Sequence, residues 1–260
     1  MIKVTGDPIA NFRRATVGAA VAATVCVLPA WIVLGRPPLD PRAAGLCLLS
    51  ASFETLYLWL LSTAYRRGDL SAAYPIARGT APLIAVGVGL LLLRETLAPV
   101  QLAGVGLLLA GIVAVTASQA RGRATVPALM TGVVIATYTS IDRIGVRLAA
   151  PWLYGWLLFT LMAIELYISL RIANRLGFGG ELEPPPWRRA ATIGAFMWLS
   201  YFLVLWALSL APLAVIAPVR EVSIVAVAGW GVWRLRERQG AALKISGAVA
   251  AVAGVALLAV

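Results

Sequence analysis

The sequence predicts an all-α polytopic membrane protein with nine transmembrane helices. Hydrophobic residues make up 61% of the 260-residue chain, and the mean hydropathy is +0.89. They are gathered in blocks of about twenty, the length that a helix needs to cross a hydrocarbon core of about 30 Å. Helices are favoured over barrel strands because lipid cannot satisfy a free backbone and the blocks lack alternation. A motif with an arginine inside an apolar segment also occurs twice, which indicates an internal repeat.

Nine apolar blocks follow one another with short polar connections. We place them at residues 15–34, 43–65, 71–93, 98–118, 125–145, 151–173, 190–210, 213–233 and 240–260. The longest connection, near Ala173 to Arg189, is rich in glycine and proline. No connection has room for a soluble domain or a nucleotide-binding motif.

The two halves of the chain share a pattern of charged and small residues. A shift of 142 residues places Arg78 on Arg220, Gly87 on Gly229, Gly89 on Gly231 and Arg94-Glu95 on Arg236-Glu237, and a shift of 143 then places Gly104 and Gly111 on Gly247 and Gly254. We therefore predict two repeats, residues 1–118 with four helices and residues 119–260 with five. The uneven count leaves two readings open: an initial helix missing from this sequence, or a nine-helix protein.

Composition excludes several classes of chemistry. The chain has no histidine, which removes histidine metal sites, Ser-His-Asp triads and histidine proton relays. Cys26 and Cys47 match no zinc or thioredoxin spacing, so we expect no cofactor and no metal. The net charge of +11 does not indicate nucleic-acid binding, because the basic residues sit between apolar blocks as membrane topology requires. Met1 to Arg14 contains no apolar core of a cleavable signal peptide.

The distribution of basic residues predicts an orientation. Fifteen of the 22 lysines and arginines fall in connections on the side of the N-terminus. The positive-inside rule then places Met1 in the cytoplasm and Val260 outside.

The repeated motif resembles the EamA domain of the drug/metabolite transporter superfamily. Leu70 to Pro82, followed by Leu93 to Thr96 and a glycine-rich helix, is similar to one copy, and Ala211 to Glu221 through Arg236-Glu237 is similar to a second. The resemblance implies ten helices in two inverted five-helix repeats, and alternating access of small metabolites. This chain would then lack the first helix of that fold. The cytoplasmic termini usual in the family disagree with the charge count, so the orientation stays open.

Charged residues inside the apolar blocks are the first candidate site residues. Ionisable groups near mid-bilayer cost about 2.5–3.5 kcal/mol each on insertion scales, so they usually face a cavity or a partner. Arg78 and Arg220 lie beside prolines that free backbone carbonyls. Each could hold an anionic group of a solute or a carboxylate that is released during transport, or could form a structural pair or carbonyl cap that holds the repeats together. Glu221, which follows Arg220, is a further charged candidate. Glu54 could bind a cation, carry a coupling proton or neutralise Arg78. Glu165 is a weaker candidate of the same kind.

Further candidates are an aspartate and several aromatic residues. Asp142 lies near a block end and reads as an interfacial anchor, although Tyr138 one turn earlier makes a cavity role credible. Ring stacking on a planar or cationic solute is the functional reading of the aromatic residues, and packing or lipid anchoring is the alternative. The aromatic candidates are Tyr57, Tyr74, Tyr138, Trp198 and Tyr201.

Small residues in matching blocks predict close helix packing rather than a site. Gly106 and Ala110 in one block, and Gly247 and Ala251 in the other, are spaced four apart.

The residues and the resemblance together predict a secondary active transporter rather than an enzyme. We expect a multi-pass protein of the cell membrane that exports a small polar or amphipathic metabolite, with protons as the coupling ion and the lipid bilayer as its surroundings. Whether it forms a homodimer is left open. The alternatives are a membrane scaffold or receptor subunit without transport and, less favoured, a lipid-modifying membrane enzyme.

Overall fold

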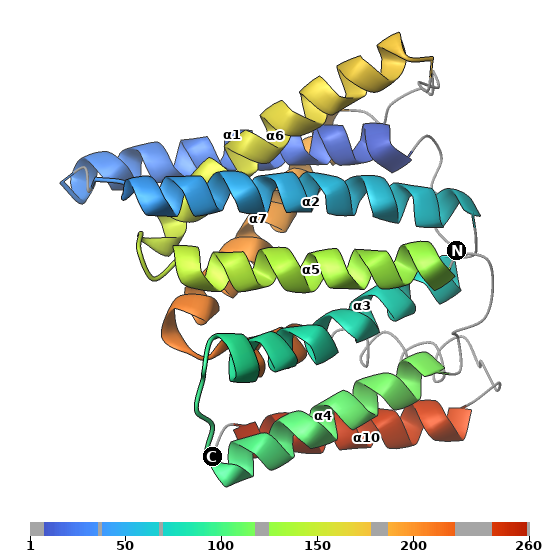
Figure 1. Cartoon of the computed structure of the whole chain (residues 1–260). Coiled ribbons are helices and arrows are strands. Elements are labelled where there is room, and N and C mark those ends of the chain that lie inside the picture. The colour runs from blue at the N-terminus through green and yellow to red at the C-terminus, as the bar shows by residue number, and fades with distance from the viewer. Residues whose placement is uncertain are drawn as a thin grey trace. The chain divides into compact units, whose positions relative to one another are not determined.

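The computed structural model describes residues 8–35, 38–67, 70–117, 125–177, 187–221 and 241–258. These residues form helices joined by short turns, and no strand occurs among them (Figure 1). The helices are α1 (Pro8–Val33), α2 (Pro41–Arg67), α3 (Leu70–Gly87), the π-helix η1 (Val88–Leu92), α4 (Pro99–Ala117), α5 (Thr125–Gly145), α6 (Pro151–Arg175), α7 (Trp187–Leu210), α8 (Leu213–Arg220) and α10 (Ala241–Leu258).

The helices confirm an all-α membrane protein. Within the described residues, α1, α2, α6 and α7 are long and apolar enough to cross a membrane, and shorter apolar segments lie at Arg78–Leu92, Pro99–Ala114 and Ile245–Leu258. The count of nine transmembrane helices stays a prediction. Large apolar side chains such as Val25 and Phe196 are exposed on α1 and α7, as expected of surfaces that face lipid.

Most of the predicted boundaries differ from the structure by a few residues, and two differ by more. Helix α1 begins at Pro8, well before residue 15, because the polar turn around Arg13 and Arg14 continues the helix beyond its apolar part. Helix α8 ends at Arg220, so it covers only the first part of the block predicted at 213–233. Pro218, which has no N–H to continue the ladder, lies in its last turn.

The chain divides into two compact units, each of which takes helices from both halves of the sequence. Unit 1 comprises Met1–Ser62 and Ile141–Leu210, and unit 2 comprises Thr63–Ser140 and Ala211–Val260. Helices α2 and α5 contribute to both units because the boundaries fall within them. The predicted repeats, residues 1–118 and 119–260, remain a prediction from the sequence.

Unit 1 is held together by small residues and by polar bonds between helices. Helix α1 packs against α6 and α7. A Cβ on Gly194 of α7 would meet the backbone of α1 at Ala15, Gly18 and Ala19, so this glycine permits the close approach. Trp59 of α2 donates to Ser169 of α6 (3.1 Å), which joins these two helices near one end.

In unit 2, helices α4 and α10 pack closely and lie side by side in Figure 1. A Cβ on Gly104 would lie 2.9 Å from the carbonyl oxygen of Gly254, and one on Gly111 would collide with that of Gly247. These pairings run in opposite directions along the two helices, which are therefore antiparallel. The prediction that Gly106 and Ala110 make this contact is wrong: both are exposed, and a Cβ on Gly106 would meet nothing within 4 Å. Ala251 does lie in the interface.

Candidate functional site

Two predicted arginines and a predicted glutamate meet in unit 2. Arg78 lies in α3, Arg220 is the last residue of α8, and Glu221 caps that helix. An Nη1 atom of Arg78 lies 3.0 Å from Oε1 and 3.3 Å from Oε2 of Glu221, so both carboxylate oxygens accept from one guanidinium. Glu221 is 2% exposed, whereas Arg78 is 20% exposed. The carboxylate is therefore the buried member of the pair.

Arg220 has looser contacts than Arg78. Its Nε lies 3.8 Å from the Glu221 carboxylate, its Nη1 donates to Thr139 (3.4 Å), and its Nη2 donates to the hydroxyl of Tyr138 (3.3 Å). The guanidinium carbon also lies 5.9 Å from the centroid of the Tyr138 ring, within the range of a cation–π contact. The hydrogen bonds of Arg220 to Thr139 and Tyr138 are therefore long, and its 3.8 Å distance to the carboxylate is that of an ion pair beyond hydrogen-bond range.

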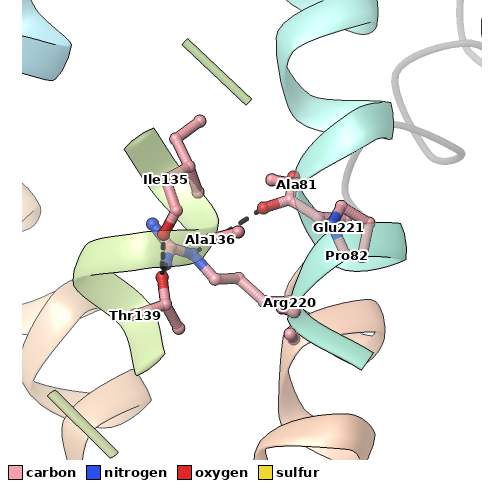
Figure 2. Close-up of a pocket in the computed structure, with 9 residues that line it drawn as sticks. Ala81, Pro82, Ile135, Ala136, Thr139, Arg220 and Glu221 are labelled. Atoms are coloured by element: carbon pink, nitrogen blue, oxygen red, sulfur yellow. Dashed lines mark hydrogen bonds and ion pairs between the residues drawn. The ribbon is translucent and has the colours of Figure 1, made fainter. Parts of the chain in front are cut away.

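The wall around these groups is apolar. Figure 2 shows Arg220 reaching across to Thr139 of α5, with Ala81 and Pro82 of α3 in the same wall. The hollow has a volume of about 10 Å³, which is room for about one water molecule. Its lining is formed by Ala81, Pro82, Ala85, Ile135, Ala136, Thr139, Ala217, Arg220 and Glu221. A hollow of this size, as the described residues form it, does not hold a metabolite.

We call Arg78, Arg220, Glu221, Tyr138 and Thr139 the arginine cluster. A proline in each arginine-bearing helix, Pro82 in α3 and Pro218 in α8, lies close to it. One carboxylate shared by two guanidinium groups can change partners without moving far. This is the chemistry of a site that binds an anion reversibly.

A second buried polar group lies in unit 1 and is built around Asp142. Its Oδ1 accepts from Ser50 of α2 (2.5 Å) and from the hydroxyl of Tyr154 of α6 (2.9 Å), and its Oδ2 accepts from Tyr201 of α7. Asp142 is fully buried, so the expectation of an interfacial anchor is wrong. We call these four residues the aspartate hub.

Neighbouring side chains pack tightly around the hub. A Cβ on Gly145 would overlap the Tyr154 ring, so this glycine makes room for the tyrosine. The thiol of Cys47 donates to the Tyr154 carbonyl oxygen (3.6 Å), and Arg143 donates to the carbonyl of Leu208. The hub therefore joins α2, α6 and α7 to the end of α5.

The other predicted site residues are distributed over α2, α3, α6 and α7. Glu54 is buried in α2 and Tyr57 is half-buried one turn on. Glu165 accepts from Ser52 (3.0 Å) on an exposed face. Trp198 stacks on Phe202 with 5.8 Å between ring centroids, a packing contact. Tyr74 belongs to α3 but its side chain lies outside the described residues, as do Gly229, Gly231, Arg236 and Glu237.

Sequence reasoning missed the neutral partners of these charges. Ser50, Tyr154 and Thr139 contact charged groups, yet none carries a sequence signal beyond being polar in an apolar block. Glu95 was noted only as part of the repeated motif, although it accepts two backbone hydrogen bonds from α8. Among the described residues no three Asp, Glu, Cys or His side chains are grouped as metal ligands would be.

Comparisons with known proteins agree with the helical membrane architecture. The model of the EamA-like transporter family matches residues 4–117. A solved crystal structure superimposes with a TM-score of 0.66 and 17% sequence identity, over 96% of this chain and 86% of that one, and is one of 24 matching chains. At this identity the superposition shows a shared fold. No curated protein sequence matches the chain significantly.

Proposed function

Because residues 4–117 of this chain belong to the EamA-like transporter family, we propose that the protein is a secondary active transporter that exports a small polar or amphipathic metabolite. Transport proceeds by alternating access between two inverted repeats, in exchange for protons. The direction and the coupling ion are expectations from the resemblance. The solute site is the arginine cluster, where Arg220 binds an anionic group of the solute and Arg78 holds Glu221.

The observation that carries this proposal is the difference between the two arginines. Arg78 contacts Glu221 at 3.0 Å, whereas Arg220 lies 3.8 Å from the same carboxylate and 3.3–3.4 Å from two neutral hydroxyls. A charged group of a solute can replace these weak contacts of Arg220 with a bidentate pair. A buried arginine in a membrane protein is expensive to maintain, and it is typically kept for such a role.

Reciprocal helix contacts in unit 2 support the inverted repeat. Gly104 corresponds to Gly247 and Gly111 to Gly254 in the repeat. The contacts pair Gly104 with Gly254 and Gly111 with Gly247. Such exchange of equivalent partners is what a two-fold axis produces. Because the two helices are antiparallel, the axis that it suggests would lie in the membrane plane, as in inverted-repeat transporters.

Transport by purified protein in proteoliposomes tests the proposal. We would measure uptake of radiolabelled monocarboxylates, amino acids and quaternary ammonium compounds, each with and without an imposed pH gradient. The wild-type protein is expected to move at least one anionic or zwitterionic solute. Arg220→Gln, which keeps a polar side chain but removes the charge, should lower that flux at least about tenfold, the effect of losing one charge-assisted pair.

The matched control is Arg171→Gln in unit 1. Arg171 is exposed and donates to the Tyr167 hydroxyl one turn away, so its loss should leave the flux unchanged. Equal flux in wild type and Arg220→Gln would remove Arg220 from the site. Absence of flux for every solute class, in protein that remains folded, would favour the scaffold or receptor alternative.

A further inference from the structure

Glu95 of the repeated Arg94-Glu95 motif accepts hydrogen bonds from the first turn of α8. Oε1 of Glu95 accepts from the backbone N–H of Leu213 (2.8 Å), and Oε2 accepts from that of Ala214 (2.9 Å). Ala214 is fully buried against Val86 of α3 and Val105 of α4. A carboxylate from the first half of the chain therefore caps a helix from the second half.

Helix α8 has no side-chain cap of its own at its start. It is eight residues long, and helices this short are marginal without outside contacts. Its N-cap residue is Pro212, which makes no side-chain cap, so the first N–H groups of the helix require an acceptor from elsewhere. Pro218 removes a further bond from the helix ladder. The Glu95 carboxylate supplies two of the missing bonds and places a negative charge at the positive end of the helix dipole.

The backbone before Glu95 is shaped to aim this carboxylate. After η1, Arg94 takes a left-handed conformation with φ of 52°, and the Glu95 N–H donates to the carbonyl of Gly89 (2.9 Å). A Cβ on Gly89 would lie 2.6 Å from Oε2 of Glu95 and 3.1 Å from Ala214. Glycine at position 89 therefore leaves the space that the carboxylate occupies.

The other end of α8 carries the arginine cluster. Arg220 is its last residue and Glu221 is its C-cap, whose N–H donates to the carbonyl of Pro218 (3.0 Å). We propose that Glu95 is a positioning residue: by fixing the start of α8, it fixes where Arg220 and Glu221 stand relative to Arg78 and Tyr138. The functional meaning of this role rests on the proposed transport site, but the geometry can be tested without a solute.

Chemical labelling of arginine provides that test. Phenylglyoxal modifies accessible guanidinium groups, and peptide mass spectrometry gives the rate at each arginine of the full-length protein in detergent. Glu95→Gln keeps one acceptor oxygen and loses the charge and one bond. We expect Arg220 to be labelled about tenfold faster in Glu95→Gln, as loss of one charge-assisted bond predicts, while the exposed Arg171 is labelled at the wild-type rate. The matched control is Gln101→Ala, which removes the acceptor of the Ala98 N–H at the start of α4, a helix without cluster residues.

A pair of glycine variants tests the same idea without changing Glu95. Gly89→Ala should push the carboxylate away from α8 and raise Arg220 labelling as Glu95→Gln does. Gly87→Ala, where a Cβ would meet nothing within 4 Å, should leave it unchanged. The double variant of Gly89→Ala with Glu95→Gln should add little to either single change, because both remove the same contact.

Flux measurements separate this role from general destabilisation. For the best-transported solute of the panel, Glu95→Gln should raise KM about tenfold with the maximal rate per folded protein nearly unchanged. A purely structural role would lower thermal stability and leave KM and Arg220 labelling as in wild type, which would overturn the proposal. If the wild-type protein moved no solute of the panel, the proposed function would fail while the labelling comparison would still decide the role of Glu95.

Discussion

The two units surround a buried carboxylate with different kinds of partner. In unit 1, the aspartate hub surrounds one fully buried carboxylate with hydroxyl donors from three helices. In unit 2, the arginine cluster places two guanidinium groups on one carboxylate, and Arg78 and Arg220 keep 20% and 13% of their side chains exposed. The cluster holds two guanidinium groups and one carboxylate, an excess of one formal positive charge with which an anionic group can form a charge-assisted pair. The hub joins helices of unit 1, and the cluster is the site proposed above for the solute.

The distances support this division. The bond from Ser50 to Asp142 is 2.5 Å long, and the bond from Tyr154 is 2.9 Å long. The contacts of Arg220 with Tyr138, Thr139 and Glu221 range from 3.3 to 3.8 Å. Short bonds that arrive from several helices resist rearrangement, while long bonds from one side chain can be exchanged at small energetic cost.

The largest effect is expected at Glu221. Glu221→Ala leaves two guanidinium groups around a buried gap, and removing one partner of a buried ion pair typically costs about 3–5 kcal/mol. Thermal unfolding in detergent should show this loss, and proteoliposomes should show no flux. Glu221→Gln, which keeps the shape, should lose less stability but also transport poorly. A melting temperature within a few degrees of wild type for Glu221→Ala would show that the arginines do not depend on this carboxylate.

The next effect concerns the hub. Asp142→Asn removes the charge that three hydroxyls donate to, and we expect it to lower the free energy of unfolding by about 2 kcal/mol. Flux per folded protein should stay within about twofold of wild type. A change of this size is smaller than the change expected from the loss of one hydrogen bond to the solute. Asp40→Asn, at the exposed start of α2, is the matched control and should change neither quantity. Loss of flux without loss of stability would instead make Asp142 part of the coupling machinery, as its place among the sequence candidates proposed.

Much of the fold follows from the sequence because lipid imposes a simple rule. Apolar blocks of sufficient length become helices, and α5 begins and ends where its block was placed, at residues 125 and 145. The block at 213–233 was predicted as one span, whereas α8 ends at Arg220 within it. Hydropathy does not show that Pro218 and a helix end lie inside this apolar run. Asp142 was predicted to be an interfacial anchor because it lies near the end of its block. Distance from the block end does not show whether neighbouring helices bury a side chain, and Asp142 is buried.

The candidate site was predicted in its charges but not in its neutral partners. Arg78 and Arg220 stand out because charge is rare in an apolar block, and the structure brings both to Glu221. In the repeat, Glu221 corresponds to Gly79, so the carboxylate that both arginines share occurs in one copy alone. Which hydroxyl faces which charge depends on helix rotation and on contacts between segments far apart in sequence. Periodicity along one chain segment does not contain that information.

The smallest effects, and the closest comparison, come from two buried tyrosines. Tyr201→Phe removes a donor to the Asp142 carboxylate and should lower the free energy of unfolding by about 1 kcal/mol without changing KM. Tyr138→Phe removes an acceptor 3.3 Å from Arg220 but keeps the ring beside the guanidinium, so it should raise KM about threefold with unchanged stability. We would measure thermal unfolding and concentration-dependent uptake for both variants under the same conditions. These measurements test whether Tyr201 acts on stability and Tyr138 on solute binding. If Tyr201→Phe changed KM and Tyr138→Phe changed stability, the assignment of fastening to unit 1 and binding to unit 2 would be reversed.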